Sequence, residues 1–241
     1  GAGYFTVLRD GETIRLYYRG RCTRDDSENQ ATCLAESADG MHFTRPELGL
    51  FEHDGSKANN IVWVGVEAHN VAPFVDANPG AKPEERYKAV GRSGGLMAMC
   101  SPDGIRWKRM QDEPLEMPGA FDSLNVAFWD ETIGLYRCFS RYFDGEGRVR
   151  AIQSCTSEDF LHWTPPKPHR YADGVPMEQF YTNATVACPG AEHILLSFPK
   201  RFVPGRKKVE AHEHDGVSDA VFMSSRDGVH WDRRFMEAWV R

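Results

Sequence analysis

The stretch SRDGVHW, Ser225–Trp231, places a Ser, an Asp-Gly pair and an aromatic residue at fixed spacing. Ser and Asp side chains bond the backbone amides of a turn, and Gly tolerates the positive φ that such a turn needs. The chain contains four copies of this pattern, which we name the turn staple: SADGMHF, SPDGIRW, SEDFLHW and SRDGVHW, beginning at Ser37, Ser101, Ser157 and Ser225. Because a turn explains every shared residue, we predict that the four Asp residues are structural.

A short β-compatible segment precedes each turn staple, namely TCLAE, LMAMC, AIQSC and AVFMS. The same order recurs upstream: a first strand, a turn, a second strand ending in a basic residue, a loop and a third strand, so that the turn staple is expected to close the fourth strand. Four strands per repeat, without the apolar period of a long helix, indicate the blades of a β-propeller. The sequence therefore predicts one all-β domain with four repeat units, over residues 3–46, 59–110, 120–166 and 178–234.

Composition narrows the class of protein. The chain has 241 residues, is 41% hydrophobic and carries a net charge of −6, which suits a packed globular protein and argues against a nucleic-acid partner. No apolar run reaches the length of a membrane span, so no membrane partner is expected. The six cysteines lack CxxC spacing, which argues against zinc ribbons and redox motifs. A secreted or periplasmic location is favoured over a cytoplasmic one.

The four turn staples, together with first strands that begin in polar residues, resemble the five-bladed propellers of glycoside hydrolases, in the group that includes families 43, 32, 68 and 130. The resemblance covers essentially the whole chain. It implies an active site at one mouth of the central channel, built from the first residues of the innermost strands. Because four repeats are visible, we expect that one blade of a five-bladed type is incomplete or lies outside this sequence.

Candidate catalytic residues follow from that resemblance. Asp122 and Glu178 precede the first strands of two successive units. Glycoside hydrolysis needs a carboxylic acid that protonates the leaving oxygen and a carboxylate on the opposite face of the sugar, and the resemblance assigns the acid to Glu178. No catalytic base is found, since a hairpin turn explains Asp10. The other side chains expected to line the mouth are His69, Asn70, Arg92, Asn125, Arg141, Tyr181 and Asn183.

Basic residues lie near the ends of the second strands of all four units: Arg19, Arg21, Arg92, Arg141, Lys200 and Arg201. If these side chains face the channel, they form a positive collar suited to carboxylate, sulfate or phosphate groups of a sugar. The alternative is that each one pairs with an acidic residue of a neighbouring blade. The sequence leaves both interpretations open.

A metal site is a weaker hypothesis. The segment EAHEHDG, residues 210–216, places His212 and His214 two residues apart, as two ligands on one strand face would be. The segment also fits a solvated loop. The resemblance implies no required cofactor, but it allows a structural or channel ion such as calcium.

The sequence thus predicts an enzyme, a glycosidase that cleaves a bond of a carbohydrate partner, and the basic residues allow that carbohydrate to be anionic. Two alternatives stay open. A carbohydrate-binding or interaction propeller without chemistry is favoured by the missing base. A glycoside phosphorylase would use the basic residues to hold inorganic phosphate.

Overall fold

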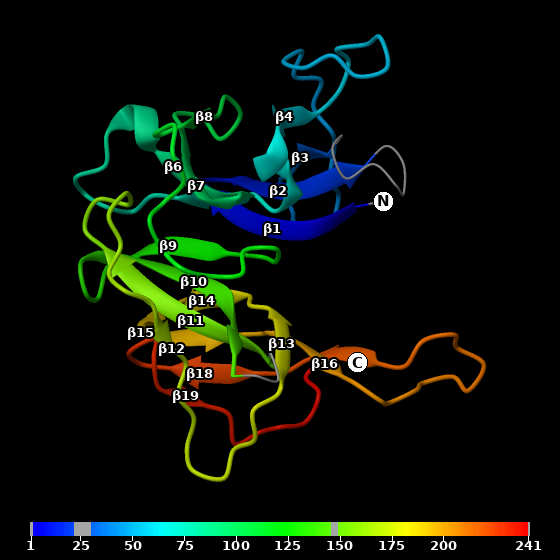
Figure 1. Ribbon diagram of the computed structural model, residues 1–241. Helices are drawn as coiled ribbons and strands as arrows, with labels where there is room; N and C mark the ends of the chain where they lie inside the picture. Colours follow the sequence, from blue (N-terminus) through cyan, green and yellow to red (C-terminus); the bar gives the residue numbers. More distant parts are fainter. Residues whose placement is uncertain (1, 22–29, 146–148, 241) are drawn as a thin grey trace. The chain divides into compact units, whose positions relative to one another are not determined.

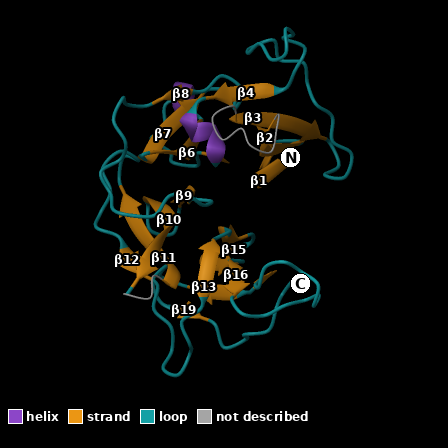
Figure 2. Ribbon diagram, turned by 45° about the vertical axis from the view of Figure 1, so that its right-hand side comes forward, coloured by secondary structure: helices purple, strands orange, loops and turns teal. Residues whose placement is uncertain are grey.

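The structure is a computed structural model that describes residues 2–21, 30–145 and 149–240. Strands dominate it, and the helices in this part of the chain are the short 3-10 segments η1 (Val66–His69) and η2 (Pro83–Glu85) (Figure 2). Neither helix is long and apolar enough to cross a membrane. The predicted all-β class is confirmed. Contacts divide the chain into two compact units: unit 1 is Gly1–Glu116 with Ala127–Trp129, and unit 2 is Met117–Val126 with Asp130–Arg241.

The first sheet of unit 1 is a four-stranded meander in chain order. It consists of β1 (Ala2–Asp10), β2 (Thr13–Arg21), β3 (Gln30–Ser37) and β4 (Ile61–Val64), which are labelled in Figure 1. The repeat boundaries had placed β4 in the second repeat, but β4 pairs with β3 and completes the first sheet. The central strand β3 is buried along most of its length, as expected for a strand covered on both faces.

The second sheet of unit 1 has the same topology. It is formed by β5 (Ala72–Val75), β6 (Tyr87–Ser93), β7 (Gly95–Ser101) and β8 (Lys108–Arg109). The apolar run of β7 is buried. Its residues Met97 and Met99 form one core cluster with Ala89 of β6 and with Val71, which directly precedes β5. Each of the two sheets is therefore a chain-ordered antiparallel unit of four strands, as predicted for a propeller blade.

Unit 2 contains two further four-stranded sheets and one insertion. The strands of the sheet ordered β12-β11-β10-β9 are β9 (Val126–Asp130), β10 (Leu135–Asp144), β11 (Val149–Ser157) and β12 (Lys167–Pro168). The middle residues of β9, 127–129, are assigned to unit 1. The strands of the sheet ordered β14-β15-β18-β19 are β14 (Thr185–Cys188), β15 (Ala191–Ser197), β18 (Met223–Ser225) and β19 (Trp231–Asp232). The insertion is the three-stranded sheet β13-β16-β17, formed by β13 (Gln179–Thr182), β16 (Lys200–Val203) and β17 (Val217–Ala220).

The turn staple beginning at Ser225 has the predicted geometry. Ser225 Oγ accepts a hydrogen bond from Gly228 N at 2.9 Å, and Asp227 Oδ1 accepts from Val229 N at 2.8 Å and His230 N at 2.7 Å. Gly228 has a φ of 81°, which glycine adopts without a steric penalty. The other three copies repeat these hydrogen bonds, which supports the structural role predicted for their Asp residues.

The position of the turn staples in the sheets differs from the prediction. Each turn staple follows the third strand of its sheet, and the fourth strand comes after it, so no turn staple closes the last strand. Three of the fourth strands, β8, β12 and β19, are two residues long. An edge strand this short has no alternating pattern of polar and apolar residues, which is why the sequence did not show it.

Phe160 replaces the turn-staple glycine in the third copy and adopts a φ of 71°. A residue with a Cβ rarely occupies this left-handed region, so the turn must be stabilised elsewhere. The Phe160 ring is fully buried and packs edge-on against Tyr136 and Trp163, with ring centroids 5.2 and 5.6 Å away. Burial of this large ring offsets the backbone strain, since a buried aromatic side chain contributes about 2–3 kcal/mol.

The structure shows a function of the turn staples that their sequence did not reveal: each unit uses one to hold two of its sheets together. In unit 2, Arg137 of β10 donates through Nη1 to the carbonyl oxygen of Asp227 at 2.7 Å, and Ser154 of β11 donates to that of Gly228 at 2.7 Å. In unit 1, Arg15 occupies the equivalent register position on β2 and donates to the carbonyl oxygen of Asp103. Unit 1 thereby has the same sheet-to-turn connection as unit 2.

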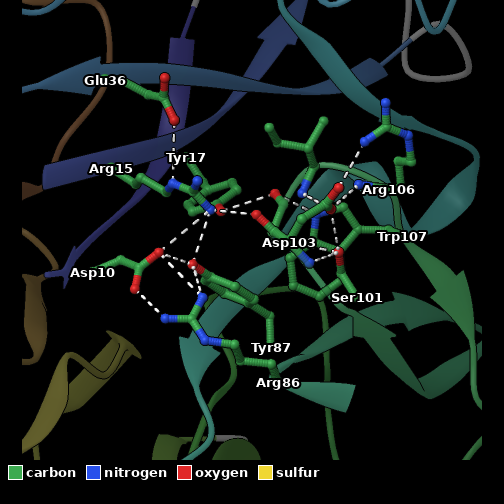
Figure 3. A network of polar contacts seen from close by, with 12 residues as sticks. Asp10, Arg15, Tyr17, Glu36, Arg86, Tyr87, Ser101, Asp103, Arg106 and Trp107 are labelled. Atoms are coloured by element: carbon green, nitrogen blue, oxygen red, sulfur yellow. Dashed lines mark hydrogen bonds and ion pairs between the residues drawn. The ribbon is translucent and has the colours of Figure 1, made fainter. Parts of the chain in front are cut away.

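Figure 3 shows this connection in unit 1, where it extends to Asp10. The Asp10 carboxylate accepts hydrogen bonds from both Arg86 and Tyr87 of the second sheet, and it lies 4.0 Å from Arg15 Nη1. The hydrogen bond from Arg86 lowers the pKa of Asp10. The sequence analysis attributed Asp10 to a hairpin turn. The turn is only part of the explanation, because this carboxylate also links the two sheets.

Replacement of Asp103 tests the structural role of the turn staples. Burial opposes its ionisation, but hydrogen bonds from Arg106 and Ile105 outweigh burial and lower the pKa of Asp103 to about 2. We expect Asp103→Ala to reduce the free energy of unfolding at pH 7 by about 1–2 kcal/mol, because the turn amides lose their acceptor. This difference from the wild type should shrink as the pH falls from about 4 towards 2, where Asp103 becomes protonated.

Urea denaturation of both proteins at several pH values measures this effect. Asp112→Ala is the matched control, since Asp112 is an exposed acidic residue of the same unit. Equal destabilisation by both substitutions would contradict a specific role of the turn staple.

Candidate functional site

Strand β13 organises the candidate site of unit 2, because its side chains alternate between two faces. Phe180 lies opposite Arg201 of β16 in the strand register, and Glu178, directly before the strand, contacts the same arginine. Gln179 and Tyr181 have the opposite parity and contact a different set of basic residues. Two clusters therefore lie at this strand, one in which acids pair with arginines and one in which basic side chains surround an aromatic ring.

The first of these, the Glu178 cluster, consists of Glu178, Arg201, Asp219 and Arg233. Arg201 donates to Glu178 Oε1 at 2.9 Å and forms a two-point contact with Asp219, at 2.9 and 2.8 Å. Arg233 Nη2 donates to the other Glu178 oxygen. The Arg233 side chain is 0% exposed and that of Glu178 25% exposed, so the carboxylate is the member of this pair that reaches solvent.

Aromatic rings hold Arg233 in place. Its guanidinium carbon lies 5.2 Å from the ring centroid of Tyr171 and 5.0 Å from that of Phe180, and its Nη1 donates to the Pro176 carbonyl. Burial raises the pKa of Tyr171, which keeps this phenol neutral. Stacking of a guanidinium between aromatic faces is favourable, and it fixes the direction in which Arg233 meets Glu178.

This arrangement limits what Glu178 can do chemically. Both carboxylate oxygens accept hydrogen bonds from charged guanidinium groups, which is the geometry of an ionised carboxylate. An ionised Glu178 is suited to orient a substrate, act as a base or stabilise positive charge. To act as the general acid that the sequence suggested, it would first have to be protonated and lose part of these contacts.

Asp122, the other predicted carboxylate, lies in the loop before β9, and its side chain is exposed. Asn125 shapes this loop, because its buried amide group donates to the carbonyl oxygens of Phe121 and Ser123, each at 3.0 Å. The hydrogen bonds of Asn125 thus fix the backbone of the loop, while Asp122 faces solvent. The catalytic assignment of Asp122 stays a prediction.

The second cluster lies around Tyr181, and we name its four members the Tyr181 cluster: Arg141, Arg150, Tyr181 and Lys200. The three cationic groups lie 5.1, 5.7 and 5.3 Å from the centre of the Tyr181 ring, respectively. They come from β10, β11 and β16, which makes this a convergence of three strands on the ring from β13.

Two hydrogen bonds of the Tyr181 cluster go to neutral acceptors. Arg141 Nε donates to the Ala120 carbonyl at 3.2 Å, and Arg150 Nη1 donates to Gln179 Oε1 at 3.3 Å. Within residues 2–21, 30–145 and 149–240, no carboxylate forms an ion pair with Arg150 or Lys200. Arg150 and Lys200 therefore differ from the two arginines of the Glu178 cluster, each of which meets an acid.

In unit 1, His69 ends the helix η1 and contacts two polar residues of the first sheet. Its Nδ1 lies 3.0 Å from Gln30 Oε1 and 3.2 Å from Arg19 Nη1. Arg19 also stacks on the Tyr4 ring, with its guanidinium carbon 4.6 Å from the ring centroid. The structure thus brings predicted lining residues of unit 1 together, and their contact with a substrate stays a prediction.

The other predicted lining residues lie in different environments. Asn70 and Asn183 are buried and bond to the backbone: Asn70 Oδ1 accepts from Arg92 N at 2.9 Å, and Asn183 Nδ2 donates to the carbonyls of Leu124 and Phe139. These contacts favour a structural role for Asn70 and Asn183. The side chain of Arg92 is exposed.

The predicted collar residues of unit 2 divide into two groups. Arg201 pairs with acidic residues, as the alternative proposed, whereas Arg141 and Lys200 gather at Tyr181. The side chain of Arg21 lies outside the described part of the chain.

The described residues do not support the hypothesis of a metal site at His212 and His214. His212 Nδ1 lies 2.9 Å from the backbone oxygen of His214 in the exposed loop between β16 and β17. No group of three or more His, Cys, Asp or Glu side chains suited to a metal is found where the chain is described. A channel ion stays an untested expectation.

Sequence reasoning missed Arg150 and Arg233. Arg233 follows the last turn staple in WDRR, where a solvated basic pair is the natural reading, and only the fold turns its side chain inward. Arg150 lies at the start of the third strand of its sheet, whereas the collar was sought at the ends of second strands. The alternation of β13 is the one signal that would have indicated two separate faces.

Comparison with solved structures shows what this fold is similar to. An N-acetylgalactosamine deacetylase from F. plautii, in complex with blood group B trisaccharide, matches with a TM-score of 0.64 at 13% identity, over 96% of this chain and 68% of that one. A thermostable family-43 glycoside hydrolase matches with a TM-score of 0.62 at 13% identity, over 100% and 74%. A structure from the GH130 family of mannoside phosphorylases and glycoside hydrolases gives 0.61 at 13% identity, over 100% and 71%.

Families 43 and 130 belong to the group that the sequence resembles, so the predicted structural resemblance is confirmed. No family model matches the sequence, and no curated protein matches it. At these identities the likeness establishes the propeller-type glycoside hydrolase fold alone, and the number of blades and the reaction do not follow from it.

Proposed function

We propose that this chain acts on a carbohydrate and cleaves a glycosidic bond, with Glu178 and Asp122 as its candidate catalytic carboxylates. The likeness to propeller-type carbohydrate-active enzymes over essentially the whole chain carries this proposal. Glu178 supports it further, because its carboxylate is held in a fixed orientation by two arginines and still reaches solvent. A fixed orientation is what catalysis on a bound sugar requires.

Glu178 is proposed to act as an ionised carboxylate that orients the sugar or stabilises its positive charge in the transition state. Glycosidic cleavage proceeds through an oxocarbenium-like transition state, which a nearby carboxylate stabilises. The proton donor is then a group other than Glu178, to which the resemblance had assigned this role, and exposed Asp122 is proposed in its place. The separation of the two carboxylates would determine whether the reaction retains or inverts configuration.

Two alternatives rest on specific observations. Both Glu178 oxygens already have partners, as expected if the site only binds carbohydrate. The Tyr181 cluster offers cationic groups that would suit inorganic phosphate in a phosphorylase.

A screen of aryl glycosides and oligosaccharides, with and without inorganic phosphate, separates these functions. We expect turnover by the wild type and a decrease in kcat of about 100-fold or more for Glu178→Gln and for Asp122→Asn. Glu158→Gln is the control, because Glu158 is an exposed acid of the same unit. Each variant must be shown to be folded by circular dichroism before its activity is measured.

Glycan binding without turnover on any substrate would contradict the enzymatic proposal and favour a binding protein. Turnover that requires phosphate would identify a phosphorylase. Full activity in Glu178→Gln would remove Glu178 from the catalytic residues.

A further inference from the structure

We propose that the Tyr181 cluster is a subsite for an anionic substituent of the glycan, a carboxylate or a sulfate group carried on the sugar. This inference rests on the proposed carbohydrate function and names the class of carbohydrate. Three basic side chains from three strands surround one aromatic ring. Cations this close together repel one another, so their convergence needs a compensating negative charge.

The Tyr181 ring supplies only part of that compensation. The negative face of an aromatic ring attracts a cation, by about 0.5–1 kcal/mol at exposed sites. Arg150 donates to a neutral oxygen, Gln179 Oε1, and neither Arg150 nor Lys200 forms an ion pair with a carboxylate of the described chain. In the described chain, other basic side chains contact carboxylates: Arg15, Lys88, Arg109, Arg137, Arg201 and Arg233.

Arg150 provides a second, independent observation. Its Nε is buried and has no hydrogen-bond partner in the described chain, and its Nη1 is engaged only weakly, at 3.3 Å from Gln179 Oε1. A buried donor without a partner is costly, at about 1–3 kcal/mol, unless a ligand or water occupies it. An oxyanion beside the guanidinium would accept from such donors, since carboxylate and sulfate oxygens match its geometry.

The site is also open to a ligand. Lys200 is exposed and Tyr181 half-buried, so the cationic groups border solvent while Arg141 anchors the cluster from within. The Tyr181 ring is of a kind that packs against sugar rings. Glu178, directly before β13, and Tyr181, within it, contact different basic residues, so the residues of the anion subsite are distinct from those of the Glu178 cluster.

Glycan-array binding with matched acidic and neutral glycans tests this subsite. One pair compares uronate-containing glycans with their carboxyl-reduced, neutral counterparts. The other pair compares sulfated glycans with their desulfated counterparts. We expect the wild type to bind at least one acidic class about tenfold or more tightly than its neutral counterpart, and to lose this preference at high salt. The arm that binds identifies carboxylate or sulfate as the recognised group.

The double variant Arg150→Gln/Lys200→Gln should lose the preference for acidic glycans. The control is Arg226→Gln/Lys167→Gln, which removes the same charge from two exposed positions of unit 2 and should retain it. Isothermal titration with inorganic phosphate and with sulfate measures whether free anions compete for the subsite.

The outcomes distinguish failure of the subsite from failure of the proposed function. Binding of neutral glycans alone, or equal acidic preference in both double variants, would overturn the subsite and leave the carbohydrate function standing. Binding of inorganic phosphate without binding of any acidic glycan would also overturn it, since the cluster would then hold a free anion. No binding of any glycan would contradict both proposals.

Discussion

Replacement of Glu178 by Gln is expected to lower the free energy of unfolding by about 3 kcal/mol, because it leaves a buried arginine without its counter-charge. Arg233 is 0% exposed and makes its ion pair with Glu178, whereas Arg201 retains Asp219 as a partner. Breaking one side of a buried pair costs more than the pair itself contributes, since the remaining charge stays desolvated. Urea denaturation at pH 7 measures the change.

Arg233→Met in the Glu178→Gln background should restore at least half of the lost stability. Methionine fills the space between Tyr171 and Phe180 and leaves no charge to be paired. Glu158→Gln should stay within about 0.5 kcal/mol of the wild type, as exposed substitutions do. If the effects of Glu178→Gln and Arg233→Met simply add, the two side chains are not coupled and the role described for this pair is wrong.

The second large effect that we expect is a loss of stability between pH 6.5 and pH 4.5, caused by His169. This side chain is 6% exposed, stacks on Trp231 at 4.8 Å and meets the Phe139 ring edge-on at 5.9 Å. Neither ring nitrogen has a hydrogen-bond partner in the part of the chain that the structure describes. Burial lowers the pKa of His169 from 6.5 to about 3.

The direction of this change in stability follows from proton linkage. Below pH 6.5, His169 binds a proton in the unfolded chain but stays neutral in the folded chain. The free energy of unfolding therefore falls as the pH decreases, and it stops falling near pH 3, where the folded chain also binds the proton. Between pH 7 and pH 4.5 the expected loss is about 3 kcal/mol. Most carboxylates titrate below this range, which isolates the histidine.

His169→Phe should remove most of this pH dependence while it preserves ring packing. Denaturation midpoints of both proteins at pH 7, 5.5 and 4.5 provide the measurement. The control His214→Gln changes an exposed loop residue and should keep the wild-type pH profile. An unchanged profile in His169→Phe would assign the acid sensitivity to other groups.

The turn staples explain why so much of the fold was predictable from the sequence. Their hydrogen bonds are local, joining residues two and three positions apart, so the same seven-residue pattern forms the same turn wherever it occurs. The buried third strands directly before them carry apolar runs that any β-structure would need. The short fourth strands β8, β12 and β19 carry no such pattern, and their place after the turn staples was missed.

The candidate site was less predictable, because its contacts join residues far apart in the chain. Arg233 is 55 residues from Glu178, and Arg150 is 29 residues from Gln179. Strand starts and strand ends indicated candidate positions, but no local rule gives the partner of a charged side chain. The same reasoning therefore placed Arg201 and Lys200 in one collar, although the fold pairs the first with acids and leaves the second beside Tyr181.

The sequence by itself determined the all-β class, the four-stranded repeat and the turns that hold it, since these depend on local hydrogen bonding and on the two-residue period of strands. Only the tertiary structure decided which charges are neutralised. It directs Glu178 towards Arg201 and Arg233, and it gathers three cations from three other strands on Tyr181. Charge pairing depends on distances across strands, and the chain order does not specify them.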